Sequence, residues 1–139
     1  MTEVLFYISS TPGIRARLAW RIAEKAWRQQ RRVYVHTASK QDAQALEALF
    51  WQQPATAFLP HVLANDTTAA GTPVVVGFGD DPGEHHDVLI NLSTTVPDFY
   101  SRFTRVAEMI CGDPEQRNSG RQRWKFYRDR GYPVQDHHL

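Results

Sequence analysis

The sequence predicts an α/β fold, in which helices flank a mostly parallel sheet. Short continuous apolar runs recur along the chain, and such runs are typical of strands that are buried on both faces. Between them lie stretches whose apolar residues recur every three to four positions, as on one face of a helix. Alternating strands and helices imply crossover connections, and therefore parallel strands.

The first part of the chain gives a strand, a helix, a strand and a helix in turn. The apolar run at 4–8 predicts the first strand, and the apolar spacing at 14–29 predicts an amphipathic helix. Residues 33–36 form a second short apolar run. Ser39, with Asp42 three positions later, resembles a capping box that starts the second helix.

The middle of the chain is less regular. Residues 52–60 form a Pro-bounded loop that carries Phe58 and Leu59, which is more apolar surface than a solvent-exposed loop normally has. We expect either that this loop folds under the sheet or that a partner covers it. Further along, the apolar runs at 74–78 and 88–92 predict two more buried strands.

A third helix is predicted after the last of these strands, starting near Pro97. Its apolar positions are Phe99, Phe103, Val106, Ala107 and Ile110. Cys111 would end this helix, just before Gly112.

A basic helix is predicted from Pro114 to about Arg130. Asp113 is a suitable N-cap and Pro114 a suitable first helical residue, while Gly131 followed by Pro133 gives a stop signal. Inside this helix a glycine, at position 120, costs about 1 kcal/mol relative to alanine. The residues beyond the stop, which include two histidines, are expected to form a terminal tail.

One face of this helix carries cations around an indole. At ~100° per residue, five side chains fall within an arc of roughly 100°. They are Arg117, Arg121, Trp124, Lys125 and Arg128. Exposed ion pairs contribute only ~0–1 kcal/mol each, so the aromatic ring is what adds an apolar anchor for an acidic partner. The alternative is a solvated basic helix whose aromatic residues pack on the body of the protein.

Length and composition limit the classes of function. With 139 residues, of which 42% are apolar, we expect residues 1–139 to form a single domain with a sizeable core. The net charge of +1 gives no global argument for nucleic-acid binding. A single cysteine excludes disulfide frameworks. No apolar run approaches the ~20 residues of a membrane span, so a cytoplasmic protein is expected.

Catalytic and metal-binding patterns are missing from the sequence. The turn at 9–13, after the first strand, has one glycine and lacks the spacing of a dinucleotide or Walker-type phosphate loop. His85, His86 and Asp87 are consecutive at a strand entrance, where neighbouring side chains point to opposite faces. Cys111 is predicted to be a buried apolar residue. We therefore expect neither catalytic residues, nor a metal, nor a cofactor.

Three stretches of the chain resemble the chi subunit family of bacterial DNA polymerase III. They are residues 4–7, residues 49–61 and residues 121–132, and the run at 88–92 followed by Phe99 and Phe103 also fits. The resemblance covers nearly the whole chain. It implies a Rossmann-like accessory protein of the clamp-loader assembly that has no catalytic activity of its own.

The resemblance also implies two partners. Chi proteins pair with the psi subunit, and they bind the acidic C-terminal tail of the single-stranded DNA-binding protein, a run of Asp that ends in Ile-Pro-Phe. Residues that match the family's positions for this acidic tail are Arg117, Arg121, Lys125, Trp124 (commonly Tyr in the family) and Ile110, with Arg128 and Tyr127 as neighbours. Trp51 and Phe58 match the aromatic residues that face psi. DNA contact would then be mainly indirect.

Two alternatives from other classes stay open at this stage. The first is a small nucleotide-binding α/β enzyme, against which the glycine-poor first turn argues. The second is direct binding of single-stranded DNA through the terminal cations and aromatic residues, because stacking platforms have a similar composition.

Overall fold

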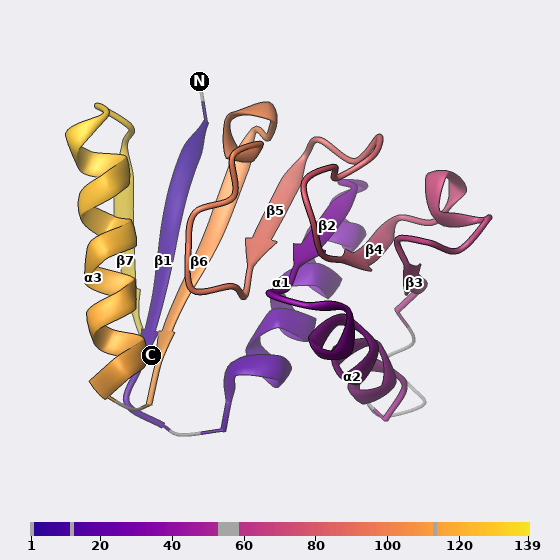
Figure 1. Cartoon of the computed structure of the whole chain (residues 1–139), viewed down its shortest axis with the longest axis horizontal. Coiled ribbons are helices and arrows are strands. Elements are labelled where there is room, and N and C mark those ends of the chain that lie inside the picture. Colours follow the sequence, from indigo (N-terminus) through magenta and orange to yellow (C-terminus); the bar gives the residue numbers. More distant parts are fainter. Residues whose placement is uncertain (1, 12, 53–58, 113) are drawn as a thin grey trace.

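The computed structural model describes residues 2–11, 13–52, 59–112 and 114–139. These residues form a seven-stranded sheet in the order β3-β4-β2-β5-β6-β1-β7, and every neighbouring pair is parallel (Figure 1). The strands are β1 (Glu3–Ser9), β2 (Val33–His36), β3 (His61–Leu63), β4 (Val74–Gly77), β5 (Val88–Asn91), β6 (Arg105–Cys111) and β7 (Val134–His138). The helices are α1 (Arg15–Arg28), α2 (Lys40–Trp51) and α3 (Pro114–Asp129), with short 3-10 turns at Ala69–Gly71 and Tyr100–Arg102. The α/β prediction is confirmed.

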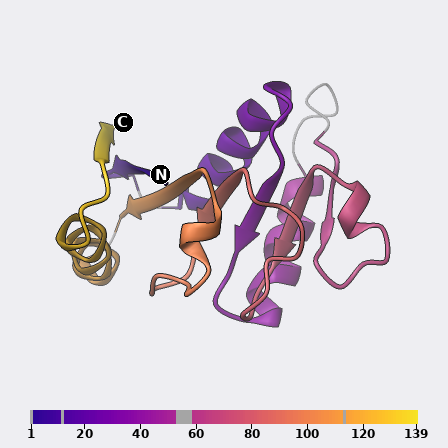
Figure 2. The ribbon, with the colours of Figure 1, turned by 90° about the horizontal axis from the view of Figure 1, so that it is seen from above.

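Helices and loops cover both faces of the sheet, which is why its inner strands are mainly apolar on both sides. In β2, Val33 and Val35 pack in the core cluster that contains α1 and α2 residues, while Tyr34 between them packs in the cluster on the α3 side. Figure 2 shows α1 and the segment around Tyr100–Arg102 on opposite sides of the sheet. A continuous apolar run therefore supplies both layers of core from one strand.

The predicted start of α2 and the predicted end of α3 are confirmed, whereas Asp113, the predicted N-cap of α3, lies outside the described residues. The Ser39 hydroxyl accepts a hydrogen bond from the Asp42 backbone N–H at 3.1 Å and so caps α2. At the end of α3, Gly131 has a φ of 80°, and the Tyr132 N–H donates to the Tyr127 carbonyl oxygen at 3.2 Å. This left-handed glycine and six-to-one hydrogen bond form a Schellman stop.

The helix predicted from Pro97 through Ile110 is wrong. A 3-10 turn at Tyr100–Arg102 is followed by β6, which lies inside the sheet between β5 and β1. The apolar residues of β6 serve both faces, because Val106 packs on the α3 side and Ala107 on the α1 side. Pairing with two neighbouring strands outweighs the local helical spacing, which arose from joining the aromatic residues of the turn to those of the strand.

Two strands carried no clear signal in the sequence. The residues expected to form a terminal tail are β7, which pairs with β1 along Val4↔Val134 to Ile8↔His138. Most of its side chains are exposed and polar, as is typical of an edge strand, so it lacks the apolar run of the inner strands. The short edge strand β3 follows the Pro-bounded loop.

Candidate functional site

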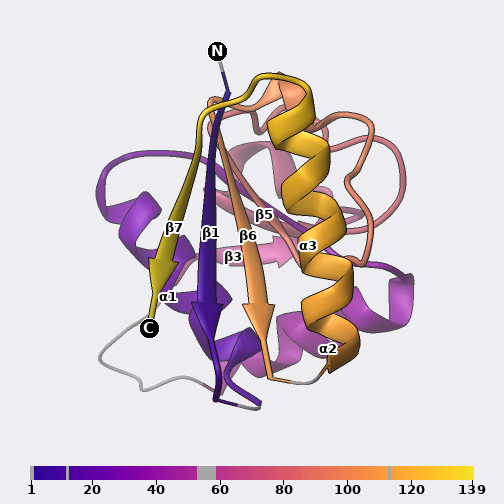
Figure 3. The same ribbon diagram turned by 90° about the vertical axis from the view of Figure 1, so that its left-hand side faces the viewer.

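The carboxyl ends of β1, β6 and β7 lie side by side at the same end of the sheet, because the three strands are parallel neighbours. The register pairs Ile8 with Ile110, and it pairs Phe6 with Asp136, so all of these side chains point to the same face. Figure 3 shows α3 beginning beside the end of β6 and running back along that face, antiparallel to the strands. This arrangement leaves a space between α3 and the strand ends.

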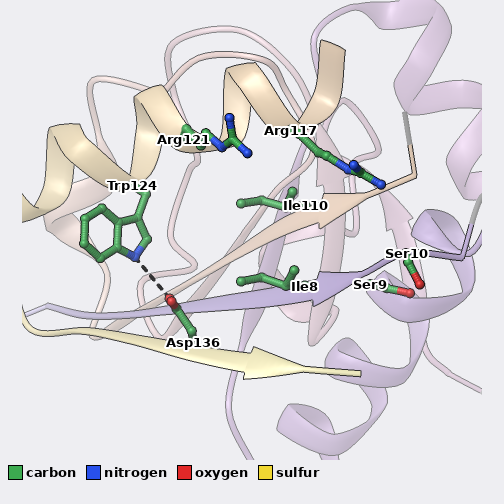
Figure 4. A pocket seen from close by; sticks show the side chains of 8 residues that line it. All are labelled: Ile8, Ser9, Ser10, Ile110, Arg117, Arg121, Trp124 and Asp136. Carbon is green, nitrogen blue, oxygen red and sulfur yellow. Dashed lines mark hydrogen bonds between the residues drawn. The ribbon is translucent and has the colours of Figure 1, made fainter. Parts of the chain in front are cut away.

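That space is a cleft of about 420 Å³, within the roughly 300–1,000 Å³ of typical ligand sites (Figure 4). The residues that line it, in the described part of the chain, are Ile8, Ser9, Ser10, Ile110, Arg117, Arg121, Trp124 and Asp136. We call it the α3 cleft. Its position agrees with the general rule that ligands of open α/β sheets bind outside the carboxyl ends of the strands.

The walls of the α3 cleft differ in chemistry. Arg117, Arg121 and Trp124 follow one another along one face of α3. Ile8 and Ile110 form an apolar floor, and both are partly buried against the core. The cleft can therefore take an apolar group on its floor and an anionic group beside the helix.

Trp124 is held in place from two sides. Its indole N–H donates a hydrogen bond to the Asp136 carboxylate at 3.1 Å, so the edge strand β7 and α3 are joined across the cleft. The guanidinium carbon of Arg128 lies 5.1 Å from the centre of the indole ring, which is a cation–π distance. The indole is thus a fixed wall.

Four of the predicted tail-binding residues line the α3 cleft, and two do not. Arg117, Arg121, Trp124 and Ile110 are among its lining residues. Lys125 is exposed on α3 outside that lining. Arg128 acts on the cleft through Trp124 and also pairs with Asp129 at 3.3 Å.

Four lining residues were missed from the sequence: Ile8, Ser9, Ser10 and Asp136. A signal existed for Ser9 and Ser10, because the loop after the first strand of an open α/β sheet is where ligand sites are expected, whereas Ile8 belongs to the strand itself. The glycine-poor sequence of that loop argues against a phosphate site and carries no pattern for another ligand. Asp136 carried no signal, because it lies in the edge strand that was expected to be a tail.

Gly120 allows α3 to lie close to β6. A Cβ atom added at this position would lie 2.4 Å from Cγ1 and 2.7 Å from Cδ1 of Ile110. Such distances are far below van der Waals contact, so only glycine fits without displacing the floor of the cleft. The unfavourable helix propensity of glycine is therefore outweighed by close packing.

A buried polar network fixes the rotation of α3 on the sheet. Arg123, on the inner face of α3, donates from Nε to Oε1 of Glu108 on β6 at 2.8 Å, and the two side chains are 7% and 0% exposed. The other carboxylate oxygen accepts from the Tyr127 hydroxyl at 2.7 Å and from the Asn91 amide at 2.9 Å. Because the inner face of α3 is held in this way, the face with Arg121 turns toward the cleft.

Burial is the largest cause of the pKa shifts of Glu108 and Tyr127 in this network. Removal from water raises the pKa of the Glu108 carboxyl, and Arg123 opposes this shift most strongly, followed by the hydrogen bonds from Asn91 and Tyr127. Burial, and next the Glu108 charge, raise the pKa of the Tyr127 hydroxyl. The hydroxyl therefore stays protonated and continues to donate to Glu108.

Among the other residues that the sequence offers as candidate ligands or nucleophiles are His85, His86 and Cys111. His85 is buried with Nε2 2.5 Å from the Thr72 carbonyl oxygen, whereas Nε2 of His86 lies 3.1 Å from the Gly83 carbonyl oxygen. Burial raises the pKa of the Cys111 thiol. Within the described ranges, no group of three His, Cys, Asp or Glu residues is arranged to hold a metal ion. None of the helices described has the length and apolar character that a membrane crossing requires.

The second predicted surface lies at the end of α2. Trp51 is 54% exposed, its indole N–H donates to the Glu47 carboxylate, and its ring centre lies 4.3 Å from that of His61. Leu49 nearby in the same helix is 42% exposed. Phe58, the other residue predicted to face psi, lies outside the described residues.

Comparison with known proteins shows the family to which this chain belongs. Residues 1–135 match the family model described as DNA polymerase III chi subunit, HolC. The chain belongs to the DNA polymerase III chi subunit family. It is 44% identical to DNA polymerase III subunit chi of Pseudomonas aeruginosa, over 100% of this chain and 98% of that protein. It is 30% identical to subunit chi of Escherichia coli K12, over 96% of each chain.

A solved structure shows that this chi-family fold also occurs in a much larger protein. The crystal structure of T4 UvsW matches 99% of this chain with a TM-score of 0.69, at 10% sequence identity. The match spans 41% of the T4 UvsW chain. At that identity, the likeness concerns the fold alone.

Proposed function

We propose that this chi-family protein is a non-catalytic adaptor of the clamp-loader complex. In this proposal the α3 cleft receives the acidic C-terminal tail of the single-stranded DNA-binding protein. The observation that carries the proposal is the combination of two arginines, one indole and an apolar floor in a single cleft. A peptide that ends in an aromatic residue and carries several carboxylates needs these groups close together.

The chemistry of each part of the cleft matches a part of the acidic tail. The terminal phenyl ring fits on Ile8 and Ile110 beside Trp124, while Arg121 and Arg117 face the terminal carboxylate and the Asp residues. A hydrogen bond to a charged group contributes ~1.5–3 kcal/mol, and burial of the ring a further ~1.5–3 kcal/mol. After the costs of association, a micromolar complex of about −8 kcal/mol is expected. Such an affinity suits repeated exchange during replication.

Titration calorimetry with a synthetic tail peptide tests this site. We predict that Arg121→Ala and Trp124→Ala each weaken binding at least tenfold, which is about 1.4 kcal/mol, and that added salt weakens binding by the wild type. Arg17→Ala is the matched control, because Arg17 is an exposed arginine of α1 and α1 packs on the other face of the sheet. Unchanged affinity in both α3 variants would reject the site.

The exposed end of α2 supports a second part of the proposal, pairing with the psi subunit. The observation that supports this part is the half-exposed indole of Trp51, because tryptophan is enriched at protein–protein interfaces. We predict that a Trp51→Ala, Phe58→Ala double variant loses co-purification with psi and keeps its affinity for the tail peptide. Retention of psi by this variant would count against the assignment.

Direct binding of single-stranded DNA is the alternative that the structure gives a reason to test. Lys125 and Arg128 are exposed next to Trp124 but do not line the cleft, so they are available to phosphates as well as to carboxylates. Fluorescence anisotropy with a bare oligonucleotide separates the two functions. Oligonucleotide binding that Arg128→Ala abolishes, together with no binding of the tail peptide, would favour the alternative.

A further inference from the structure

The α3 cleft contains a carboxylate, which is unexpected at a site that receives an acidic peptide. Asp136 is an exposed residue of β7, and its carboxylate accepts the indole N–H of Trp124 at 3.1 Å. The other charged residues that line the cleft, within the described part of the chain, are Arg117 and Arg121. The cleft is therefore not uniformly positive.

The strand register separates these charges along the cleft. Asp136 lies opposite Phe6, whereas the apolar floor at Ile8 is two residues closer to the end of β1. The serines that line the cleft follow Ile8 at the end of this strand. Asp136 is therefore at the end of the cleft that lies farther from the strand ends.

Helix α3 runs in the opposite direction to β1, so its residue numbers increase toward the Asp136 end of the cleft. Because it runs antiparallel to β1, Arg117 near its start lies toward the strand ends, and Trp124 two turns later lies toward Asp136 (Figure 4). One end of the cleft thus carries Arg117 and the serine hydroxyls, and the other carries Asp136 and the indole, with Arg121 between them.

We propose that Asp136 is a specificity-determining residue that fixes the direction in which an acidic peptide lies in the cleft. This inference rests on the proposed function of the α3 cleft. The Asp side chains of the ligand lie toward Arg117, its terminal aromatic ring lies on the floor, and its terminal carboxylate pairs with Arg121, so no acidic group lies beyond the ring toward Asp136. A carboxylate placed past the aromatic ring would meet the fixed negative charge of Asp136.

The same charge discriminates between classes of ligand. In an acidic peptide that ends in an aromatic residue, the Asp side chains all lie on one side of the ring, and the single terminal carboxylate can pair with Arg121, so no charge has to approach Asp136. A single-stranded nucleic acid carries a negative charge at every nucleotide and would place phosphates at both ends of the cleft. Asp136 therefore favours the peptide over the nucleic acid, while its hydrogen bond keeps the Trp124 wall in position.

Neutralising the charge without losing the hydrogen bond tests the inference. In Asp136→Asn, the amide oxygen still accepts the Trp124 N–H, but the charge is gone. Asp98→Asn is the matched control, because Asp98 is an exposed acid that does not line the cleft, and the change in net charge is the same. Two peptides are compared: the acidic tail itself, and the tail extended by two Asp residues after its terminal Phe.

The expected result depends on the peptide. Asp136→Asn should bind the extended peptide about two- to fivefold more tightly than the wild type does, the size of one exposed charge interaction. The gain should be smaller for the acidic tail itself and should vanish at about 1 M salt, where the Debye length is ~3 Å. A merely structural role for Asp136 would affect both peptides alike and would not depend on salt.

The outcomes separate this inference from the proposed function. If the wild type binds the acidic tail and Asp136→Asn matches Asp98→Asn for both peptides, the directional role is wrong and the proposed function stands. If the wild type binds neither peptide, both are wrong. A gain that is larger for the extended peptide than for the acidic tail, and that is seen only at low salt, supports both.

Discussion

Replacement of Arg123 by methionine should destabilise the protein far more than the same change at Arg121, two residues away in α3. Arg123 forms the buried ion pair with Glu108 at 2.8 Å and also donates to the Met109 carbonyl oxygen at 3.2 Å. Removing one partner of a buried pair leaves an uncompensated charge, which costs about 3–5 kcal/mol. Arg121 is exposed, so Arg121→Met should change the free energy of unfolding by less than about 0.5 kcal/mol.

Urea unfolding followed by circular dichroism measures this difference. With an m-value of about 2 kcal/mol/M, the loss lowers the urea midpoint by about 2 M. The double variant Arg123→Met, Glu108→Gln should regain more than half of the lost stability, because the glutamine is neutral and still accepts from Tyr127 and Asn91. An Arg123→Met midpoint within about 0.5 M of the wild type, or a double variant no more stable than the single one, would refute the reasoning.

Two further predictions concern the packing of α3 against β6. Gly120→Ala improves helix propensity by about 1 kcal/mol, yet its methyl group collides with Ile110, so we expect a net loss of about 1–3 kcal/mol in urea unfolding and weaker tail binding; a stabilised variant would contradict this. The stability deficit of Arg123→Met should shrink between pH 8 and pH 5. Burial raises the pKa of the Glu108 carboxyl, and the variant lacks Arg123, the group that opposes this shift most strongly. The pKa of Glu108 is therefore higher in the folded variant than in the unfolded chain, where it has the ordinary value of about 4.3. The folded variant then binds a proton that the unfolded chain does not, so its free energy of unfolding rises as the pH falls toward about 4.3. A deficit independent of pH, in urea titrations at both values, would show that Glu108 stays charged.

Most of α3 was predictable because its signals are local. Pro114 and Gly131 mark its ends, and helical periodicity alone groups Arg117, Arg121 and Trp124 on one face. The same periodicity places Arg123 on the opposite face. Its partner could not be predicted, because the segment that contains Glu108 was expected to be a helix.

The parts that failed depend on contacts between distant segments. Whether residues 105–111 form a helix or a strand is decided by their pairing with β1 and β5, which no local spacing records. The edge strand β7 is polar on most of its length, and its position comes from pairing with β1. Asp136 was therefore missed, although it joins the edge of the sheet to Trp124. The apolar floor was half predicted, since Ile110 came from the family resemblance and Ile8 from the register alone.

The most direct test of the account is a methyl NMR titration with the acidic tail peptide. The chain has five isoleucines, of which Ile8 and Ile110 line the α3 cleft. We predict that the tail peptide shifts these two δ1 methyl resonances by the ring current of its terminal Phe, and that a peptide ending in Ala does not. The methyls of Ile22 on α1 and Ile90 in the opposite core layer serve as internal controls. Shifts at the control methyls without shifts at Ile8 and Ile110 would place the peptide elsewhere and contradict the account.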